Sequence, residues 1–205
     1  MALLVLATAM SFSPGPNNTL AAALGANHGL RGAMPFVWAV PAGWGVMLGL
    51  CALGLGALLL AVPVLASALK LLGVAYLLWL ASKLMGVRFQ FNRPSAPASR
   101  SDAGQASVTF WQGAAFQFVN IKAWLFALTV VSGWVAGRSE PGTRFAIVLT
   151  VMLVYAFASN FAYALAGSLL RKWLAGPNES GRRLVWFNRL MALVLVGTAV
   201  WMSLL

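Results

Sequence analysis

Long apolar stretches alternate with short polar connections along almost the whole chain. Several of these stretches exceed the roughly 18 apolar residues that indicate a transmembrane helix. Pro41 is expected to kink the second stretch and Pro63 to end it. The six expected segments cover residues 2–27, 34–62, 67–85, 108–135, 145–170 and 184–205. The pattern therefore predicts an all-α integral membrane protein with six transmembrane helices.

The first segment is interrupted in its middle by the sequence Ser13-Pro14-Gly15-Pro16-Asn17-Asn18. Each proline removes a backbone donor and clashes with the preceding helical turn, and the glycine relaxes the backbone between them. Within a bilayer, such a break is tolerated only where it is buried in protein or lines a wet cavity. We therefore expect the first helix to be broken near the middle of the membrane.

A polar connector rich in Ser, Pro, Arg and Gly divides the chain into two halves of three expected helices each. Residues 1–86 form the first three-helix half, residues 87–107 the connector and residues 108–205 the second half. Three helices per half force related halves into opposite orientations, which is the inverted repeat of many secondary transporters. Each half opens with a long helix that carries a polar interruption, and in the second half this is Asn120-Ile121-Lys122. A matched pair of interrupted helices is typical of a binding site at the midplane of the membrane.

Composition and charge agree with a membrane protein. The chain has 205 residues, of which 61% are hydrophobic and only 8% charged, and its net charge is +11; its mean hydropathy is +0.85. The expected loops after the first, third and fifth segments carry ten of the 14 Lys and Arg residues. The positive-inside rule places these loops in the cytoplasm and both termini outside. Charges that are scattered over short loops favour contact with anionic lipid head groups over a nucleic-acid partner.

The break in the first segment is a candidate binding site. Pro16 suits the first position of a new helix, and the N–H groups of Asn17, Asn18 and Thr19 would then face the cavity. Such a positive helix terminus suits a substrate carboxylate. The alternative is a kink that neighbouring helices pack against, although a kink alone does not require two prolines and two asparagines.

Lys122 is the one charged residue expected deep within a segment. An ammonium group at that depth costs about 3 kcal/mol on the insertion scale, so it is a functional candidate. The alternative is that Lys122 caps the carbonyl groups at the end of the first half-helix, around residues 11–13. Asn120 and Asn160 are expected to be buried amides that form interhelical hydrogen bonds, and Asn120 gains functional weight from its neighbour Lys122.

With these residues in view, the chain resembles the LysE/RhtB family of amino-acid exporters over nearly its whole length. The matching motifs are Pro14-Gly15-Pro16-Asn17, the glycine-spaced turn of residues 25–32, residues 70–76, residues 110–113 and Asn120-Ile121-Lys122-Ala123. Two positions depart from the family's pattern, because Ile121 stands where a proline is usual and Asn17 where Asp is frequent. The resemblance implies export of amino acids or related metabolites from the cytoplasm, driven by an ion gradient.

We therefore expect a secondary active exporter of small, neutral amino acids or their derivatives in the bacterial inner membrane. No carboxylate lies within an expected segment to balance a cationic substrate, and the expected coupling ion is a proton. Lys122 is the candidate carrier of that proton. The alternative functions are an integral membrane enzyme or an accessory scaffold that acts on a lipid-linked substrate. The expected substrate-binding residues are Pro14, Gly15, Pro16, Asn17, Asn18, Asn120 and Lys122.

The remaining expectations concern partners. One cysteine, Cys51, and one histidine, His28, are too few to form a metal site, and no cofactor is expected. The expected surroundings are membrane lipids. The glycine pairs Gly25 and Gly29, and Gly45 and Gly49, have the spacing for close helix packing, either inside one protomer or in a homo-oligomer.

Overall fold

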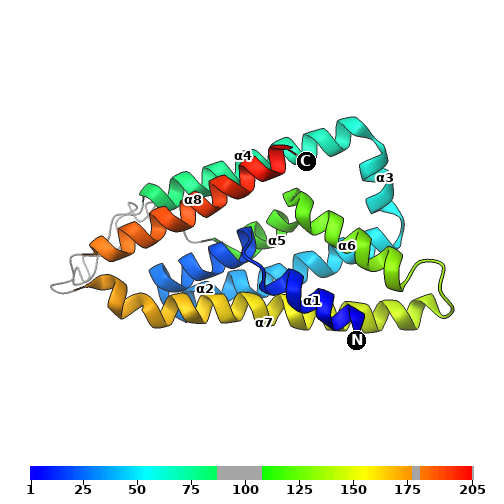
Figure 1. The fold of residues 1–205 in the computed structure, drawn as a ribbon, viewed down its shortest axis with the longest axis horizontal. Helices are drawn as coiled ribbons and strands as arrows, with labels where there is room; N and C mark the ends of the chain where they lie inside the picture. The colour runs from blue at the N-terminus through cyan, green and yellow to red at the C-terminus, as the bar shows by residue number, and fades with distance from the viewer. Residues whose placement is uncertain (87–107, 177–180, 205) are drawn as a thin grey trace.

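The computed structural model describes residues 1–86, 108–176 and 181–204 (Figure 1). In this part of the chain the secondary structure is entirely helical. The expected connector at residues 87–107 lies outside the described residues. The eight described helices are α1 (Ala2–Phe12), α2 (Pro16–Ala52), α3 (Leu55–Ala61), α4 (Pro63–Gly86), α5 (Phe110–Val119), α6 (Ile121–Trp134), α7 (Pro141–Ala175) and α8 (Arg182–Leu204).

Four of the described helices, α2, α4, α7 and α8, are long and apolar enough to cross a membrane. The pair α5 and α6 makes a fifth crossing if the two are counted together, and it is bent by 71° at Asn120. This architecture confirms the all-α membrane class. The six-helix count and the inverted repeat stay predictions.

The expected break in the first segment lies where the prolines predict it. Helix α1 ends at Phe12, and Ser13 and Gly15 are extended, with φ/ψ angles of −62°/144° and −171°/176°. Pro16 is the first residue of α2, where its missing N–H group removes no helical hydrogen bond. With only 11 residues, α1 is too short to span a bilayer on its own.

Helix α2 reverses its direction at Gly29, whose φ of 73° is easily adopted only by glycine. Pro41, where the sequence predicts a kink, keeps helical backbone angles. Along α2 up to Gly29, the contacting residues on α7 lie progressively closer to the C-terminus of α7. Beyond Gly29, they lie progressively closer to its N-terminus. In α2 order, the neighbours are Gly25 with Ala164, Gly29 with Arg171, Trp38 with Phe157 and Gly45 with Leu153. The two arms of α2 therefore lie against α7 in opposite directions.

The prediction of one continuous helix over residues 34–62 is wrong. This segment is divided by a turn after Ala52, where Gly54 adopts a left-handed φ of 85° before α3 begins. The third segment begins at Pro63, four residues earlier than expected, because proline is tolerated in the first turn of a helix.

Helix α2 lies at the centre of the molecule, in contact with α5, α6, α7 and α8. Glycines allow these helices to approach closely. A side chain on Gly25 would collide with the carbonyl group of Ala164, and one on Gly167 with that of Ala22. Figure 1 shows the C-termini of α4 and α7 and the N-terminus of α8 together at one end of the molecule. This packing holds both helix breaks inside the bundle.

Candidate functional site

The C-terminus of α1 is capped by side chains from within and beyond the break. Asn18 Nδ2 donates hydrogen bonds to the carbonyl oxygens of Ser11 and Ser13, at 2.7 and 2.9 Å. Ser13 Oγ donates to the carbonyl of Met10 at 2.9 Å, and the hydroxyl of Tyr163 on α7 donates to that of Phe12 at 3.0 Å. Three of these bonds satisfy carbonyls in the last turn of α1, which a helix end leaves without partners, and the fourth satisfies the carbonyl of Ser13. The cap at this helix end is therefore Asn18, and Lys122 does not take that role.

The N-terminus of α2 presents two backbone donors. The N–H of Thr19 donates to the carbonyl of Gly15 at 2.9 Å, which is the first hydrogen bond of the helix. The expectation that the N–H of Thr19 faces the cavity is therefore wrong. The N–H groups of Asn17 and Asn18 remain at the helix terminus, where the helix dipole favours an anion.

The side chain of Asn17 is paired with Gln117 on α5. Asn17 Nδ2 donates to Gln117 Oε1 at 2.9 Å, and Gln117 Nε2 donates back to Asn17 Oδ1 at 3.2 Å. Gln117 is fully buried and also donates to the carbonyl of Gly113 at 3.1 Å. This pair links the two interrupted helices, so Asn17 can offer a ligand its backbone but not an unpaired amide.

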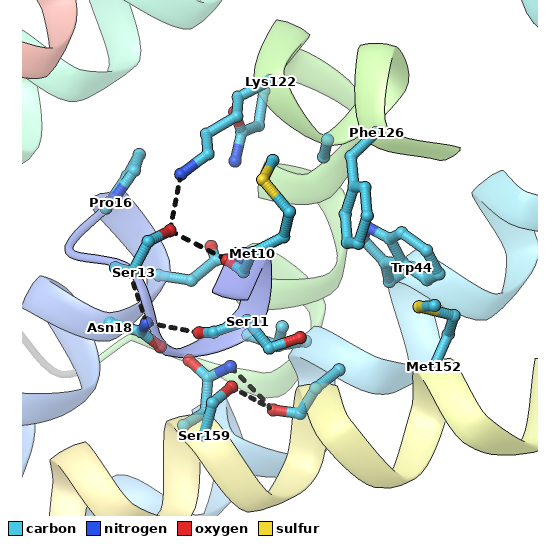
Figure 2. Close-up of a pocket in the computed structure, with 17 residues that line it drawn as sticks. Met10, Ser11, Ser13, Pro16, Asn18, Trp44, Lys122, Phe126, Met152 and Ser159 are labelled. Atoms are coloured by element: carbon cyan, nitrogen blue, oxygen red, sulfur yellow. Dashed lines mark hydrogen bonds between the residues drawn. The ribbon is translucent and has the colours of Figure 1, made fainter. Parts of the chain in front are cut away.

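The second break directs Lys122 toward the first. Asn120 ends α5 and precedes α6 with an extended backbone (φ −90°, ψ 96°). The indole nitrogen of Trp124 donates to the carbonyl of Phe118 at 2.8 Å across the bend, which fixes its geometry. Figure 2 shows Lys122 reaching from this bend to the break in the first helix, where Nζ lies 3.2 Å from Ser13 Oγ.

A cavity of about 80 Å³ lies between the two breaks (Figure 2). Six of the seven expected site residues line it, and Pro14 faces a second cavity on the other side of Lys122. Residues of α1, α2, α6 and α7 complete the wall. The 17 residues that line the cavity are Met10, Ser11, Ser13, Gly15, Pro16, Asn17, Asn18, Val40, Trp44, Asn120, Lys122, Ala123, Phe126, Met152, Ala156, Ser159 and Asn160.

The residues of the cavity wall include one cation and two asparagines whose side-chain oxygens have no partner among the described residues. Lys122 is the single charged side chain in its wall and is half-buried. Asn120 Oδ1 and Asn160 Oδ1 are buried and accept no hydrogen bond from the described residues. Asn160 Nδ2, in contrast, donates to the carbonyl of Ala156 at 2.8 Å. A buried acceptor without a donor is costly, so these two oxygens are suited to a ligand that carries N–H groups.

Sequence reasoning assigned Asn160 to helix packing and overlooked the apolar wall of Met10, Phe126 and Met152. An asparagine inside the otherwise apolar helix α7 was the available signal for the first. The sequence contains no signal for the apolar wall, because the residues that form it look like ordinary core residues. Among the described residues, no three His, Cys, Asp or Glu side chains come close enough to hold a metal ion.

The known proteins that resemble the chain are transport proteins. The family model "LysE type translocator" matches residues 8–204. A cysteine/O-acetylserine efflux protein of Salmonella choleraesuis (strain SC-B67) is 31% identical over 190 residues, which cover 93% of this chain and 90% of the relative. A protein of the same name from Escherichia coli (strain K12) is 30% identical over 195 residues, covering 95% and 91%. No solved structure matches the chain significantly.

These matches confirm the resemblance that the sequence motifs suggested. They describe transport proteins, so the alternative of a membrane enzyme is excluded. Together with the apolar helices, they show a multi-pass protein of the bacterial inner membrane. The chain belongs to the LysE family of translocators.

Proposed function

We propose that the chain is a secondary active exporter of small, neutral amino acids, which it binds as zwitterions in the cavity between the two helix breaks. One observation carries this proposal. Lys122, Asn120 and Asn160 line the same small cavity, and the side-chain oxygens of the two asparagines are buried without a hydrogen-bond partner in the described part of the chain. These groups are the complement of an α-carboxylate and an α-ammonium group.

The carboxylate would lie at the start of α2. There it can accept hydrogen bonds from the N–H groups of Asn17 and Asn18 and pair with Lys122 Nζ. The α-ammonium group would donate to Asn120 Oδ1 and Asn160 Oδ1, which satisfies both buried acceptors. Each charged group of the substrate then has partners of the opposite polarity.

A second positive charge on the substrate would have no counter-ion. The described residues that line the cavity include no Asp or Glu, and Lys122 already contributes a positive charge. Burial of an unpaired ammonium or guanidinium group costs several kcal/mol. The site therefore favours neutral over basic amino acids.

The cavity suits a small side chain of low polarity. Since a water molecule needs roughly 10–15 Å³ of such volume, about 80 Å³ corresponds to a handful of water molecules. Met10, Trp44, Phe126 and Met152 form an apolar wall, and the methionines can adapt to side chains of different shape. Cysteine and O-acetylserine, which the relatives are named for, are small and neutral.

The two interrupted helices also support alternating access. In an inverted repeat, one half rocks against the other around a fixed midplane site. The Asn17–Gln117 pair and the contact between Lys122 and Ser13 both join the two breaks. We propose a six-helix 3+3 repeat in which a proton, carried by Lys122, couples this movement to the ion gradient.

Efflux from cells that overproduce the chain tests the proposal, with empty vector as the control. We expect release of O-acetylserine, cysteine or another small neutral amino acid, and no release of lysine or arginine above the vector level. Asn160→Ala is expected to weaken export, since it removes one acceptor for the α-ammonium group. Ser132→Ala is the matched control, because within the described residues this exposed hydroxyl bonds only to carbonyls of its own helix. Robust lysine or arginine efflux would contradict the proposed charge selection.

A further inference from the structure

A second and larger cavity lies beside the first, between α8 and the break in the first helix. Its volume is about 410 Å³. Gly197 faces open space there, since a side chain added to it would meet nothing within 4 Å. The residues that line this cavity are Pro14, Gly15, Pro16, Lys122, Val194, Gly197, Thr198 and Trp201.

The two cavities share a thin wall. Gly15, Pro16 and Lys122 line both of them. Gly15 has no side chain, and a Cβ atom placed on it would lie 3.4 Å from Lys122 Nζ. The ammonium group of Lys122 is therefore the only charged group at the point where the cavities meet within the described residues.

Lys122 has bonding capacity on both sides of this wall. An ammonium group has three donors, and the described residues accept one of them, at Ser13 Oγ. The four-carbon side chain of lysine is flexible, so the ammonium group can follow an anion over a short distance. A carboxylate bound to Lys122 in one cavity can therefore stay paired while it moves into the other.

We propose that the cavity against α8 is a second substrate chamber on the transport path, and that Lys122 passes the carboxylate of a zwitterionic amino acid between the two chambers. In this chamber, the hydroxyl of Thr198 offers the substrate a polar contact, while Val194 and Trp201 provide an apolar surface. This inference rests on the proposed function, because it names the next station of the same substrate. It assigns a binding role to α8, a helix that contains none of the expected site residues.

Cysteine labelling tests the chamber directly. Cys51 is the only cysteine, so Cys51→Ala provides a cysteine-free background. Gly197→Cys in this background should react with a charged, hydrophilic methanethiosulfonate reagent, because the thiolate that reacts forms only where water enters. O-acetyl-L-serine should slow this reaction, by about tenfold at ten times its dissociation constant. L-lysine at the same concentration should not, and the label should block export by the variant.

Gly49→Cys in the same background is the matched control. Gly49 is also a helical glycine with open space around it, but it lines neither cavity. We expect no reaction with the charged reagent there. Should Gly197→Cys fail to reach the membrane, Thr198→Cys gives the same test one residue along the same cavity.

The outcomes separate this inference from the proposed function. Export by the Cys51→Ala parent tests the proposed function alone. The rate of labelling, in contrast, can be measured whether or not the protein exports a substrate. An unreactive Gly197→Cys, if Thr198→Cys is also unreactive, would show that no aqueous chamber exists. Reaction that O-acetyl-L-serine does not slow, or a label that leaves export unchanged, would show that the cavity lies off the path.

Discussion

Breaking the Asn17–Gln117 pair is expected to reduce both stability and export. Gln117→Leu keeps a similar side-chain volume but removes the two hydrogen bonds between α2 and α5. Interhelical hydrogen bonds in membrane proteins contribute about 0.6 kcal/mol each on average, so the pair is worth about 1.2 kcal/mol. A dry, unpaired amide on Asn17 would add about 1–3 kcal/mol. Because Asn17 is half-buried and lines the cavity, water can reach it, and we expect a total loss of about 1–2 kcal/mol.

A double-mutant cycle with Asn17→Ala and Gln117→Leu measures this interaction. Reversible unfolding in mixed detergent micelles gives the free energy of unfolding of each variant, and efflux is measured at matched protein levels. The expected coupling energy between the two positions is about 1.2 kcal/mol. Export should fall further than the loss of folded protein explains, because the pair orients the start of α2.

The chain contains a matched control for this experiment. Asn27 and Asn188 exchange two amide hydrogen bonds of 2.7 and 2.9 Å but line neither cavity. Asn188→Leu should cost a similar free energy of unfolding and leave the export rate per folded molecule unchanged. A coupling energy near zero at the first pair, or equal effects of both pairs on export, would refute the reasoning.

Four further outcomes are expected. Lys122→Arg should still bind substrate but lose pH-dependent efflux, since arginine keeps its charge and does not release a proton; wild-type pH dependence in this variant would exclude Lys122 as the proton carrier. Replacement of residues 14–16 by alanine should let the first helix run on and abolish export while the protein still inserts, so normal efflux would show that the break serves geometry alone. Gly25→Ala should cost about 1–3 kcal/mol in the free energy of unfolding, because the new methyl group meets the carbonyl of Ala164; an unchanged value would argue against close packing of α2 on α7. Reporter fusions should place residues 87–107 in the cytoplasm and the C-terminus outside, and a cytoplasmic C-terminus would overturn the charge argument.

The two helix breaks could be predicted because their causes are local. Pro14 and Pro16 interrupt a helix wherever they occur, and the polar residues around Asn120 stand out from an apolar segment. The reversal at Gly29 was not predictable in the same way. Its spacing from Gly25 resembles a packing motif, and only the backbone shows that Gly29 is a hinge. The turn at Gly54 was missed for the same reason, since a single glycine in an apolar run also occurs inside helices.

The pairing of polar groups was also beyond reach of the sequence. Asn17 and Gln117 are one hundred residues apart, and no local pattern indicates that their amides meet. Either Asn18 or Lys122 could supply a donor for the end of α1, and only the geometry shows that Asn18 does so. The sequence does not distinguish Asn160 from a packing residue, and only the fold shows that its side-chain oxygen has no hydrogen-bond partner among the residues that the structure describes.

Hydrogen-bond accounting at the breaks separates residues that maintain the fold from residues that are available to a substrate. Asn18 uses its amide donors on the end of α1, and Asn17 uses its side chain on Gln117. Because the bonds from Asn18 already satisfy the end of α1, Lys122 is not needed as its cap, and Lys122 lines both cavities. An unpaired buried group is normally selected against, so groups that stay unpaired at a helix break require another explanation. The zwitterionic substrate that we propose would supply that explanation, since it would satisfy Lys122 and the amide oxygens during only part of each transport cycle.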